Sequence, residues 1–370
     1  MKKLIFILFL PIIFSYSCNR DDEPELIPVY TPTPYKIEVP YGFPTQLNIP
    51  EDNPMTVEGV ELGRYLFYDG RLAGRADEDK YMSCSSCHLQ ENSFIIGQPR
   101  PAPFGLDGNS THHVMLPLIN LVWNPGQYGW NGSIPSIEED VLGVITAPNE
   151  FNSTYEKVEN VIGNIPGYPE LFRKAFGTNE VTVDRIAKAI AQFVRTLISA
   201  DSKFDRYLRG EIQLTSSELN GFVLFTTEEG ADCFHCHGGA GNPLFTTNGF
   251  YNNGKDIIFD DPEDRYSVTG NPTDHGAYKA TTLRNIEYTA PYMHDGRFNT
   301  LDEVIDFYSS GLVWSPYIDP LMHHIATGGN MLTPTEKADL KAFLLTLSDT
   351  TFINNQEFGK PDKFPDENPF

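Results

Sequence analysis

Two short stretches decide the fold: Cys84-Ser85-Ser86-Cys87-His88 and Cys233-Phe234-His235-Cys236-His237. Both follow the pattern C-x-x-C-H, which is the attachment signature of a c-type haem. Two thiols three residues apart can both reach the vinyl groups of one porphyrin, and the next residue presents an imidazole to the iron. We therefore predict two covalent haems. The predicted attachment residues are Cys84, Cys87, His88, Cys233, Cys236 and His237, with His88 and His237 as iron ligands.

Two other uses of paired cysteines fit this sequence less well. A zinc ribbon places its two C-x-x-C units about 15–20 residues apart, whereas these units lie in different halves of the chain and each carries a trailing histidine. A dithiol redox motif is expected beside a strand–helix–strand unit, and neither stretch has such surroundings. Covalent haem attachment remains the favoured interpretation.

Length and composition predict a chain of two ordinary domains. The 370 residues are 40% hydrophobic, so a core can form without disulfides. Four of the five cysteines belong to the two haem motifs, and the fifth is Cys18. The formal net charge of −23 argues against nucleic acid as a partner, because nucleic-acid binding needs a basic surface.

Residues 1–18 resemble the signal peptide of a lipoprotein. Lys2 and Lys3 precede an apolar run, Leu4–Phe14, that is too short to span a bilayer as a mature helix. Cys18 follows at the position where a lipoprotein cysteine is lipidated. Tyr16 departs from the usual small residue, so a plain signal peptide cleaved near Cys18 is the alternative. We expect a location in the cell envelope, outside the cytoplasm, with a lipid anchor in the outer membrane and a periplasmic or surface-facing domain.

The remaining chain divides into four predicted segments. Eight prolines between Pro24 and Pro54 favour an extended, semi-rigid tether over residues 19–55. An N-terminal cytochrome c-like domain is predicted over 56–200 and a C-terminal one over 201–352, each with one haem. Residues 353–370 form a C-terminal tail.

Apolar periodicity and capping residues predict a mainly α-helical fold. The clearest helix covers Val183–Ser199, with apolar residues at helical spacing on one face. Helices are also expected at Val60–Tyr68, Ser136–Val144 and Leu301–Tyr308, after the capping boxes at Thr215 and Thr333, and over 152–178, where Pro166 and Pro169 break the pattern.

Several longer stretches resemble the bacterial di-haem cytochrome c peroxidases, nearer their MauG-like branch. The resemblance covers roughly residues 56–350. It is carried by both haem motifs and by Leu62–Tyr68, Leu116–Gly132 (LPLINLVWNPGQYGWNG), Arg195–Gly210 (RTLISADSKFDRYLRG) and Ala280–Ser310 (ATTLRNIEYTAPYMHDGRFNTLDEVIDFYSS).

The resemblance implies that the two domains have different roles. The N-terminal haem meets hydrogen peroxide, and the C-terminal haem receives electrons from a small cytochrome c or another one-electron donor and passes them on. The resemblance leaves the oligomeric state open, with a homodimer as one alternative.

Three residues are implied to act in catalysis. Members of the family carry an essential glutamate twenty residues after a tryptophan, which corresponds here to Glu150 after Trp130. A carboxylate near an open iron face can move a proton between the two peroxide oxygens. Trp130 matches the tryptophan between the two haems, where an indole can relay an electron. Asp140 is the third residue and is expected near the peroxide pocket, where the family usually has glutamine.

The first haem is expected to keep an open face. In reductively activated members a histidine about sixteen residues after the first haem motif closes the iron. Phe104 occupies that position here. His112 and His113 are nearby, and surface positions in a loop are the preferred interpretation for both.

The outer ligand of the second haem has two candidates. The family position, on the helix after the P-Y-x-H-x-G stretch, is occupied by Tyr308, and Met293 is the rival. A calcium ion between the domains is also implied, bound by the carbonyls of Thr289 and Pro291. The third calcium ligand of the family is an asparagine, and here its position is Val114 or Met115.

The sequence is compatible with three functions. The favoured one is reduction of hydrogen peroxide to water with electrons from a one-electron donor. The second is MauG-type oxidation of a protein side chain. The third is a di-haem electron-transfer protein or redox sensor without turnover, against which Glu150 and the open first haem argue.

Overall fold

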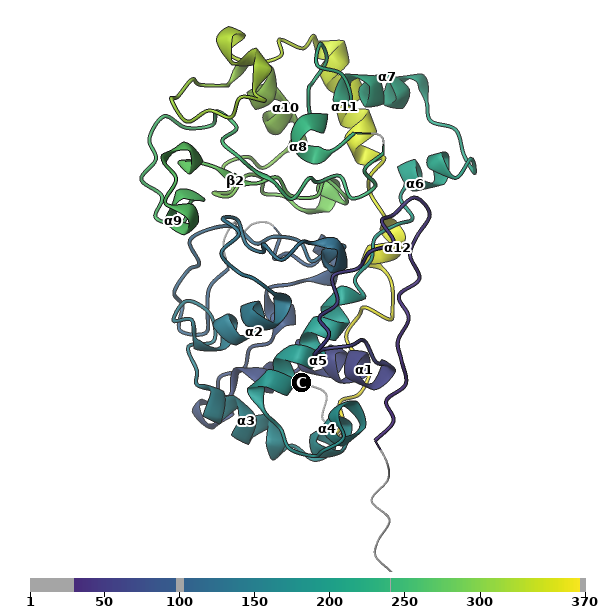
Figure 1. The fold of residues 1–370 in the computed structure, drawn as a ribbon, viewed down its shortest axis with the longest axis vertical. Helices are drawn as coiled ribbons and strands as arrows, with labels where there is room; N and C mark the ends of the chain where they lie inside the picture. The colour runs from purple at the N-terminus through teal and green to yellow at the C-terminus, as the bar shows by residue number, and fades with distance from the viewer. Residues whose placement is uncertain (1–29, 98–102, 240, 367–370) are drawn as a thin grey trace, which may run out of the picture.

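The computed structural model describes residues 30–97, 103–239 and 241–366, and two helical domains lie one above the other along its long axis (Figure 1). Each has its own hydrophobic core. The predicted signal peptide and Cys18 lie outside the described residues. Within the described ranges no helix is long and apolar enough to cross a membrane.

The prediction of a mainly helical fold is confirmed. The α-helices are α1 Val57–Tyr68, α2 Ile137–Thr146, α3 Tyr155–Gly163, α4 Tyr168–Phe176, α5 Val183–Arg195, α6 Lys203–Leu208, α7 Ser216–Phe225, α8 Phe234–His237, α9 Tyr266–Thr269, α10 Leu301–Ser310, α11 Pro334–Leu345 and α12 Thr350–Ile353. Short 3-10 helices cover Gly70–Ala73, Ala76–Glu78, Cys84–Ser86, Gln90–Asn92, Leu121–Trp123, Pro272–Asp274, Ile286–Tyr288 and His323–Thr327. A two-residue antiparallel pair joins β1 Phe250–Tyr251 to β2 Tyr278–Lys279.

The two domains share one packing arrangement. In each, the helix that precedes the haem motif crosses the last long helix of its domain: α1 crosses α5, and α7 crosses α11. Glycine makes both close approaches possible, since a Cβ on Gly63 or Gly221 would lie 1.9 Å from a backbone oxygen of the partner helix. Each haem motif is therefore placed beside a rigid helix pair.

Local sequence signals account for most helix starts. The side chain of Ser136 accepts a hydrogen bond from the backbone N–H of Glu139 at the start of α2. Thr215 and Thr333 form the expected capping boxes of α7 and α11. Helix α5 ends at Arg195, four residues before the predicted Ser199, because the chain turns there into the junction between the domains.

Residues 30–55 do not form the free tether predicted for this part of 19–55. They run along the N-terminal domain to the junction and back (Figure 1). Ile37, Phe43 and Met55 are buried in a cluster with Trp123, and the Phe43 and Trp123 ring centroids are 5.1 Å apart. The Asn48 N–H donates to the Val122 carbonyl at 2.7 Å. Proline restrains this segment without preventing its apolar side chains from packing.

The C-terminal segment also returns to the N-terminal domain. Phe352 and Phe364 lie in the N-terminal core, so the boundary predicted at 352 falls too late. The Tyr68 hydroxyl donates to the Phe358 carbonyl at 2.7 Å. Arg71 pairs with Asp366 at 2.5 Å. The N-terminal domain is thus completed by residues 352–366.

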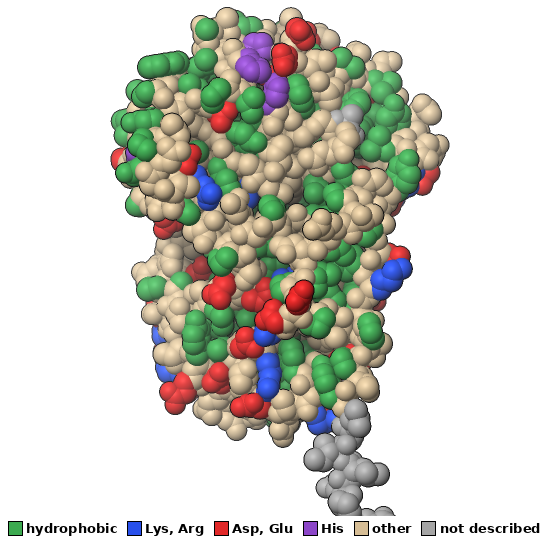
Figure 2. Space-filling model, in the orientation of Figure 1, with side chains coloured by type: hydrophobic (Ala, Val, Ile, Leu, Met, Phe, Trp, Pro, Cys, Tyr) green, Lys and Arg blue, Asp and Glu red, His purple; other side chains and the backbone are tan. Residues whose placement is uncertain are grey.

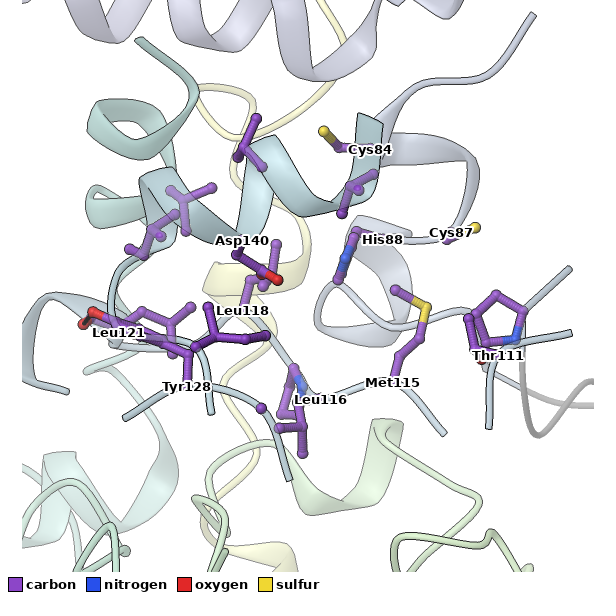
Figure 3. Close-up of a pocket in the computed structure, with 18 of the residues that line it drawn as sticks. Cys84, Cys87, His88, Thr111, Met115, Leu116, Leu118, Leu121, Tyr128 and Asp140 are labelled. Carbon is purple, nitrogen blue, oxygen red and sulfur yellow. Dashed lines mark hydrogen bonds between the residues drawn. The ribbon is translucent and has the colours of Figure 1, made fainter. Parts of the chain in front are cut away.

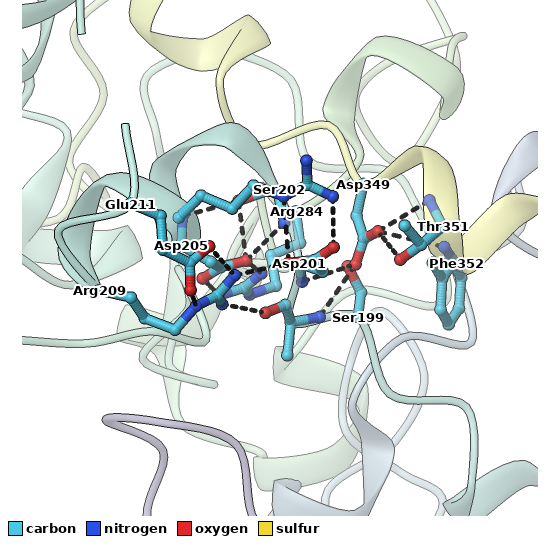
Figure 4. A network of polar contacts seen from close by, with 12 residues as sticks. Ser199, Asp201, Ser202, Asp205, Arg209, Glu211, Arg284, Asp349, Thr351 and Phe352 are labelled. Carbon is cyan, nitrogen blue, oxygen red and sulfur yellow. Dashed lines mark hydrogen bonds and ion pairs between the residues drawn. The ribbon is translucent and has the colours of Figure 1, made fainter. Parts of the chain in front are cut away.

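A buried polar network fixes the junction between the domains (Figure 4). One oxygen of Asp349 accepts three hydrogen bonds, each of 3.0 Å, from the Ser199 hydroxyl and from the backbone of residues 200 and 201. Nearby, Arg284 makes two hydrogen bonds to Asp205, of 2.7 and 2.8 Å. Burial alone would raise the pKa of Asp205, but the bonds from Arg284 outweigh it and lower that pKa.

Candidate active site

The first haem motif lies on the wall of a cavity of about 400 Å³ in the N-terminal domain. Cys84, Cys87 and His88 line it, and Figure 3 shows the His88 ring pointing into it. Nδ1 of His88 is 2.6 Å from the Phe94 carbonyl oxygen. This contact assigns the ring proton to Nδ1 and leaves Nε2 with its lone pair. Burial lowers the pKa of His88 to about 4, so the imidazole is neutral and able to bind a metal.

The second motif has the same arrangement in a smaller cavity of about 210 Å³. Cys233, Cys236 and His237 line it. Nδ1 of His237 is 3.0 Å from the Thr281 carbonyl oxygen. Burial lowers the pKa of His237 to about 4. Each domain thus offers one neutral imidazole and two cysteines to one cavity.

These residues fit a c-type haem in both places. None of the four cysteines of the two motifs is in a disulfide, so all four can bond to a porphyrin. The hydrogen bond on Nδ1 is the outer-shell contact that orients a metal-binding histidine. The larger cavity falls within the usual size range of cofactor sites, about 300–1,000 Å³.

Asp140 and Glu150 both line the first cavity and are half-buried. Figure 3 shows the Asp140 carboxyl group pointing from α2 into the same space as the His88 ring. Burial raises the pKa of Asp140 to about 6. Burial, and then the charge of Asp140, raise the pKa of Glu150 to about 7. Two carboxyl groups whose pKa values are raised toward neutrality therefore line the cavity into which the His88 ring points.

Backbone contacts hold Glu150 in the turn that follows α2. Its N–H donates to the Ala147 carbonyl at 3.0 Å, and its carbonyl accepts from the Leu106 N–H at 2.7 Å. The next residue, Phe151, is buried in the core. The side chain of Glu150 is therefore presented from an anchored loop, as a positioned proton carrier requires.

Trp130 lines both cavities. Its indole N–H donates to the Val114 carbonyl at 2.8 Å, and its ring centroid lies 6.3 Å from that of His294 at an angle of 70°. Its carbonyl accepts from the Lys279 N–H at 2.9 Å, which ties it to β2. Trp130 thus lies between the two cavities, and its role as an electron relay stays a prediction.

Both candidate outer ligands of the second haem reach the second cavity. Tyr308 enters from α10 and Met293 from the preceding loop. The Asn253 amide donates to the Tyr308 hydroxyl at 3.0 Å and lies 3.7 Å from the Met293 sulfur. Burial raises the pKa of Tyr308. The two alternatives stay open, with Tyr308 the preferred one.

The expected calcium site is only partly represented. The Val114 N–H donates to the His294 carbonyl at 2.9 Å, so the loop at 114 lies beside the stretch that contains Thr289 and Pro291. Val114 and Met115, however, carry no oxygen on their side chains to replace the asparagine of the family. Calcium binding stays a prediction.

Lys279 is a site residue that the sequence did not single out. It is buried, it lines both cavities, and its ammonium group lies 4.5 Å from the centroid of the Phe250 ring. Burial and the charge of Arg265 lower its pKa to about 8. A buried cation between the cavities suits an anionic group of a cofactor. No sequence signal marks it, because its burial depends on β1 and β2.

Comparison with known proteins identifies the family. The model of the di-haem cytochrome c peroxidase family matches residues 57–213. The cytochrome c551 peroxidase of Nitrosomonas europaea is 36% identical over 266 residues, which cover 68% of this chain and 73% of that protein. The methylamine utilization protein MauG of Methylorubrum extorquens is 32% identical over 306 residues, which cover 82% of each chain.

Solved structures agree with these relatives. A MauG-like protein associated with microbial copper homeostasis superimposes with a TM-score of 0.79 at 33% identity, covering 88% of this chain and 99% of that one. The di-haem peroxidase BthA of Burkholderia thailandensis shares the fold, with a TM-score of 0.64 at 21% identity and coverage of 88% and 99%. The chain therefore belongs to the di-haem cytochrome c peroxidase family and is a peroxidase-type oxidoreductase.

Proposed function

We propose that this protein reduces hydrogen peroxide to water with electrons from a small cytochrome c or another one-electron donor. Peroxide reacts in the cavity of the N-terminal domain, and electrons enter through the C-terminal domain. The observation that carries the proposal is the pair Glu150 and Asp140, whose pKa values of about 7 and about 6 lie near neutrality in the cavity that His88 lines.

The reaction consumes two electrons and two protons for each peroxide and releases two waters. Cys84, Cys87 and His88 would hold a haem, which would supply a Lewis-acidic iron and store electrons. Glu150 takes the proton from the peroxide oxygen nearer the iron and returns it to the leaving oxygen. A group with a pKa of about 7 can both accept and release a proton at neutral pH, which favours this role.

Asp140 tunes this proton transfer. Its negative charge raises the pKa of Glu150, as burial does. When the proton resides on one of the two carboxyl groups, the other is more easily ionised, so the pair titrates as a unit. Asp140 also places a second carboxyl group on the wall of this cavity.

Trp130 provides the path between the domains. It borders both cavities, and its indole N–H is fixed by the Val114 carbonyl. Replacing Trp130 by Phe keeps an aromatic ring but removes the indole N–H and the easily oxidised indole. We expect electron transfer from the C-terminal to the N-terminal centre to slow, while reduction of the C-terminal centre by the donor is unchanged in a rapid-mixing experiment.

A haem held in the first cavity would keep one face of its iron open. His112 and His113 line the cavity, but their Nε2 atoms lie 3.1 and 2.7 Å from the Asp261 carboxylate. Phe104 brings no ligand atom. The Asp261 contacts compete with any approach of these imidazoles to the iron, so we infer that peroxide has access without prior reduction.

The cofactor content has a direct test. The purified mature protein should carry two covalent haems, visible as a mass increment of two haem groups and as a c-type pyridine haemochrome spectrum. A single haem would refute the proposal. Metal analysis of the same sample tests the calcium expected at Thr289 and Pro291.

MauG-type oxidation of a protein side chain is the second candidate. The 32% identity to MauG over 82% of this chain favours it. In that case the two electrons come from a protein substrate. Incubation with peroxide and an extract of the cell envelope should then produce a covalently modified partner without an added donor.

We also propose that the protein is exported and anchored to the outer membrane through a lipid on Cys18. The apolar run Leu4–Phe14 and the cysteine behind it support this. Labelling with a radioactive fatty acid should depend on Cys18. An unlabelled, fully soluble wild-type protein would exclude the anchor.

A further inference from the structure

His112, His113 and Asp261 meet where a loop of the N-terminal domain touches a loop of the C-terminal domain. Nε2 of His112 lies 3.1 Å from one oxygen of Asp261, and Nε2 of His113 lies 2.7 Å from the other. One donor atom from each of the three residues can be chosen so that all lie within 4.8 Å of one another.

We propose that these three residues bind one divalent transition-metal ion, with Zn²⁺ as the reference ion, and thereby link the two domains. Two imidazoles and one carboxylate are a donor set typical of zinc. Bonds of about 2.0–2.2 Å to a tetrahedral ion place neighbouring ligand atoms about 3.3–3.5 Å apart. The observed separations of 3.1 and 2.7 Å need only small side-chain shifts to reach that spacing.

The carboxylate of Asp261 is already held in place by outer contacts. The Tyr278 hydroxyl donates to one of its oxygens at 2.5 Å, and the Glu263 N–H donates to the other at 2.9 Å. His113 is mostly buried, with 10% of its side chain exposed. Such outer-shell bonds orient first-shell ligands and preserve metal affinity. His112 is exposed, which gives the ion a route from solvent.

The proposed site differs from the calcium site expected at Thr289 and Pro291. That site uses backbone oxygens, which suit a hard cation, whereas imidazole nitrogen selects transition-metal ions. None of the three proposed ligands carries a proton or an electron in the peroxide chemistry described above, although His112 and His113 line the first cavity.

The site lies next to the path between the two cavities. Tyr278 stacks on His294 with ring centroids 3.5 Å apart, and His294 lies 6.3 Å from Trp130. A bound ion would tie the loop at 112–113 to the loop at 261 and so hold the domain contact beside Trp130 in one arrangement.

Zinc binding by the complete, haem-loaded protein tests this proposal. After treatment with a chelator, equilibrium dialysis against Zn²⁺ is followed by elemental analysis. Wild type should bind a zinc ion that His113→Gln binds at least about 100-fold more weakly, beyond the 10–100-fold loss typical of an outer-shell change. The exposed His112→Gln should behave alike, and it tests the site without disturbing buried packing. Unchanged haem absorbance verifies that both variants fold.

A second cluster of metal-binding groups supplies the matched control. Glu228, His235 and His323 also come together, on the C-terminal domain, where Figure 2 shows histidines gathered on one face. His323→Gln should leave the proposed zinc ion in place. The proposal is overturned if His323→Gln loses the zinc that His113→Gln retains, or if wild type binds no more zinc than His112→Gln.

Tyr278→Phe probes the outer contact. It removes the hydroxyl that donates to Asp261 and keeps the ring that stacks on His294. Zinc affinity should fall by about 10–100-fold. Added zinc should also raise the thermal unfolding temperature of wild type and not that of His113→Gln, since an ion that binds only the folded state stabilises it. Equal shifts in the two proteins would refute the link between the domains.

Discussion

Replacement of Glu150 by Gln tests the proposed proton carrier. The change is nearly isosteric, and backbone bonds to Ala147 and Leu106 hold the loop independently of the side chain. Folding and haem attachment should therefore persist. The amide cannot take a proton from peroxide, so the rate of peroxide consumption should fall by about 10²–10⁴-fold. That loss corresponds to about 2.7–5.4 kcal/mol of transition-state stabilisation.

The size of the loss in peroxide consumption depends on whether Asp140 can replace Glu150 as the proton carrier. The Asp140 carboxyl group lines the same cavity and has a pKa of about 6, so it can transfer protons to and from peroxide when Glu150 is replaced. A loss near 10²-fold would indicate such rescue, and a loss near 10⁴-fold would indicate none. The double variant with Asp140→Asn separates these two results, because it removes both carriers.

Steady-state peroxide consumption with a reduced small cytochrome c or the dye donor ABTS measures this effect. The control is Glu139→Gln, which makes the same chemical change at an exposed position on α2. The control should retain wild-type turnover, and reduction of the second haem should be equal in all variants. Turnover of Glu150→Gln within about twofold of wild type, far below the expected range, would refute the assignment.

Three further predictions follow from the pKa values, the second cavity and the junction. In the pH–rate profile, activity should rise as the carboxylate of Glu150 forms near pH 7. Asp140→Asn should shift this rise to lower pH, because it removes the charge that raises the Glu150 pKa. A rise at unchanged pH would contradict the interaction between the two carboxyl groups. Tyr308→Phe should change the spectrum and reduction potential of the second haem while Met293→Leu leaves both unchanged, and the reverse result would make Met293 the ligand. Asp349→Asn should lower the free energy of unfolding by about 3 kcal/mol or more in a denaturant titration, because an oxygen that accepts three buried hydrogen bonds becomes a donor.

Features encoded over a few residues were predictable from the sequence. The haem motifs are local, since two thiols and one imidazole lie within five positions, and both motifs do face cavities. Helix starts at Ser136, Thr215 and Thr333 are equally local, because a cap bonds to a backbone N–H three residues ahead.

Contacts between distant segments could not be predicted in this way. Proline content favoured an extended tether, but it does not report that Phe43 packs on Trp123. The burial of Lys279 depends on strand pairing with β1, and the pairing of His113 with Asp261 joins positions 148 residues apart. The family resemblance pointed to Glu150, whereas the raised pKa it shares with Asp140 follows only from the shape of the cavity.

The ratio of donor oxidised to peroxide consumed tests the central claim most directly. The haem-loaded wild-type protein is mixed with a known amount of peroxide and an excess of reduced small cytochrome c, and both are followed to completion. The proposed function predicts two donor molecules oxidised for each peroxide lost, because each peroxide takes two electrons on its way to two waters. Peroxide consumption without donor oxidation, or no consumption above that of free haem, would contradict it.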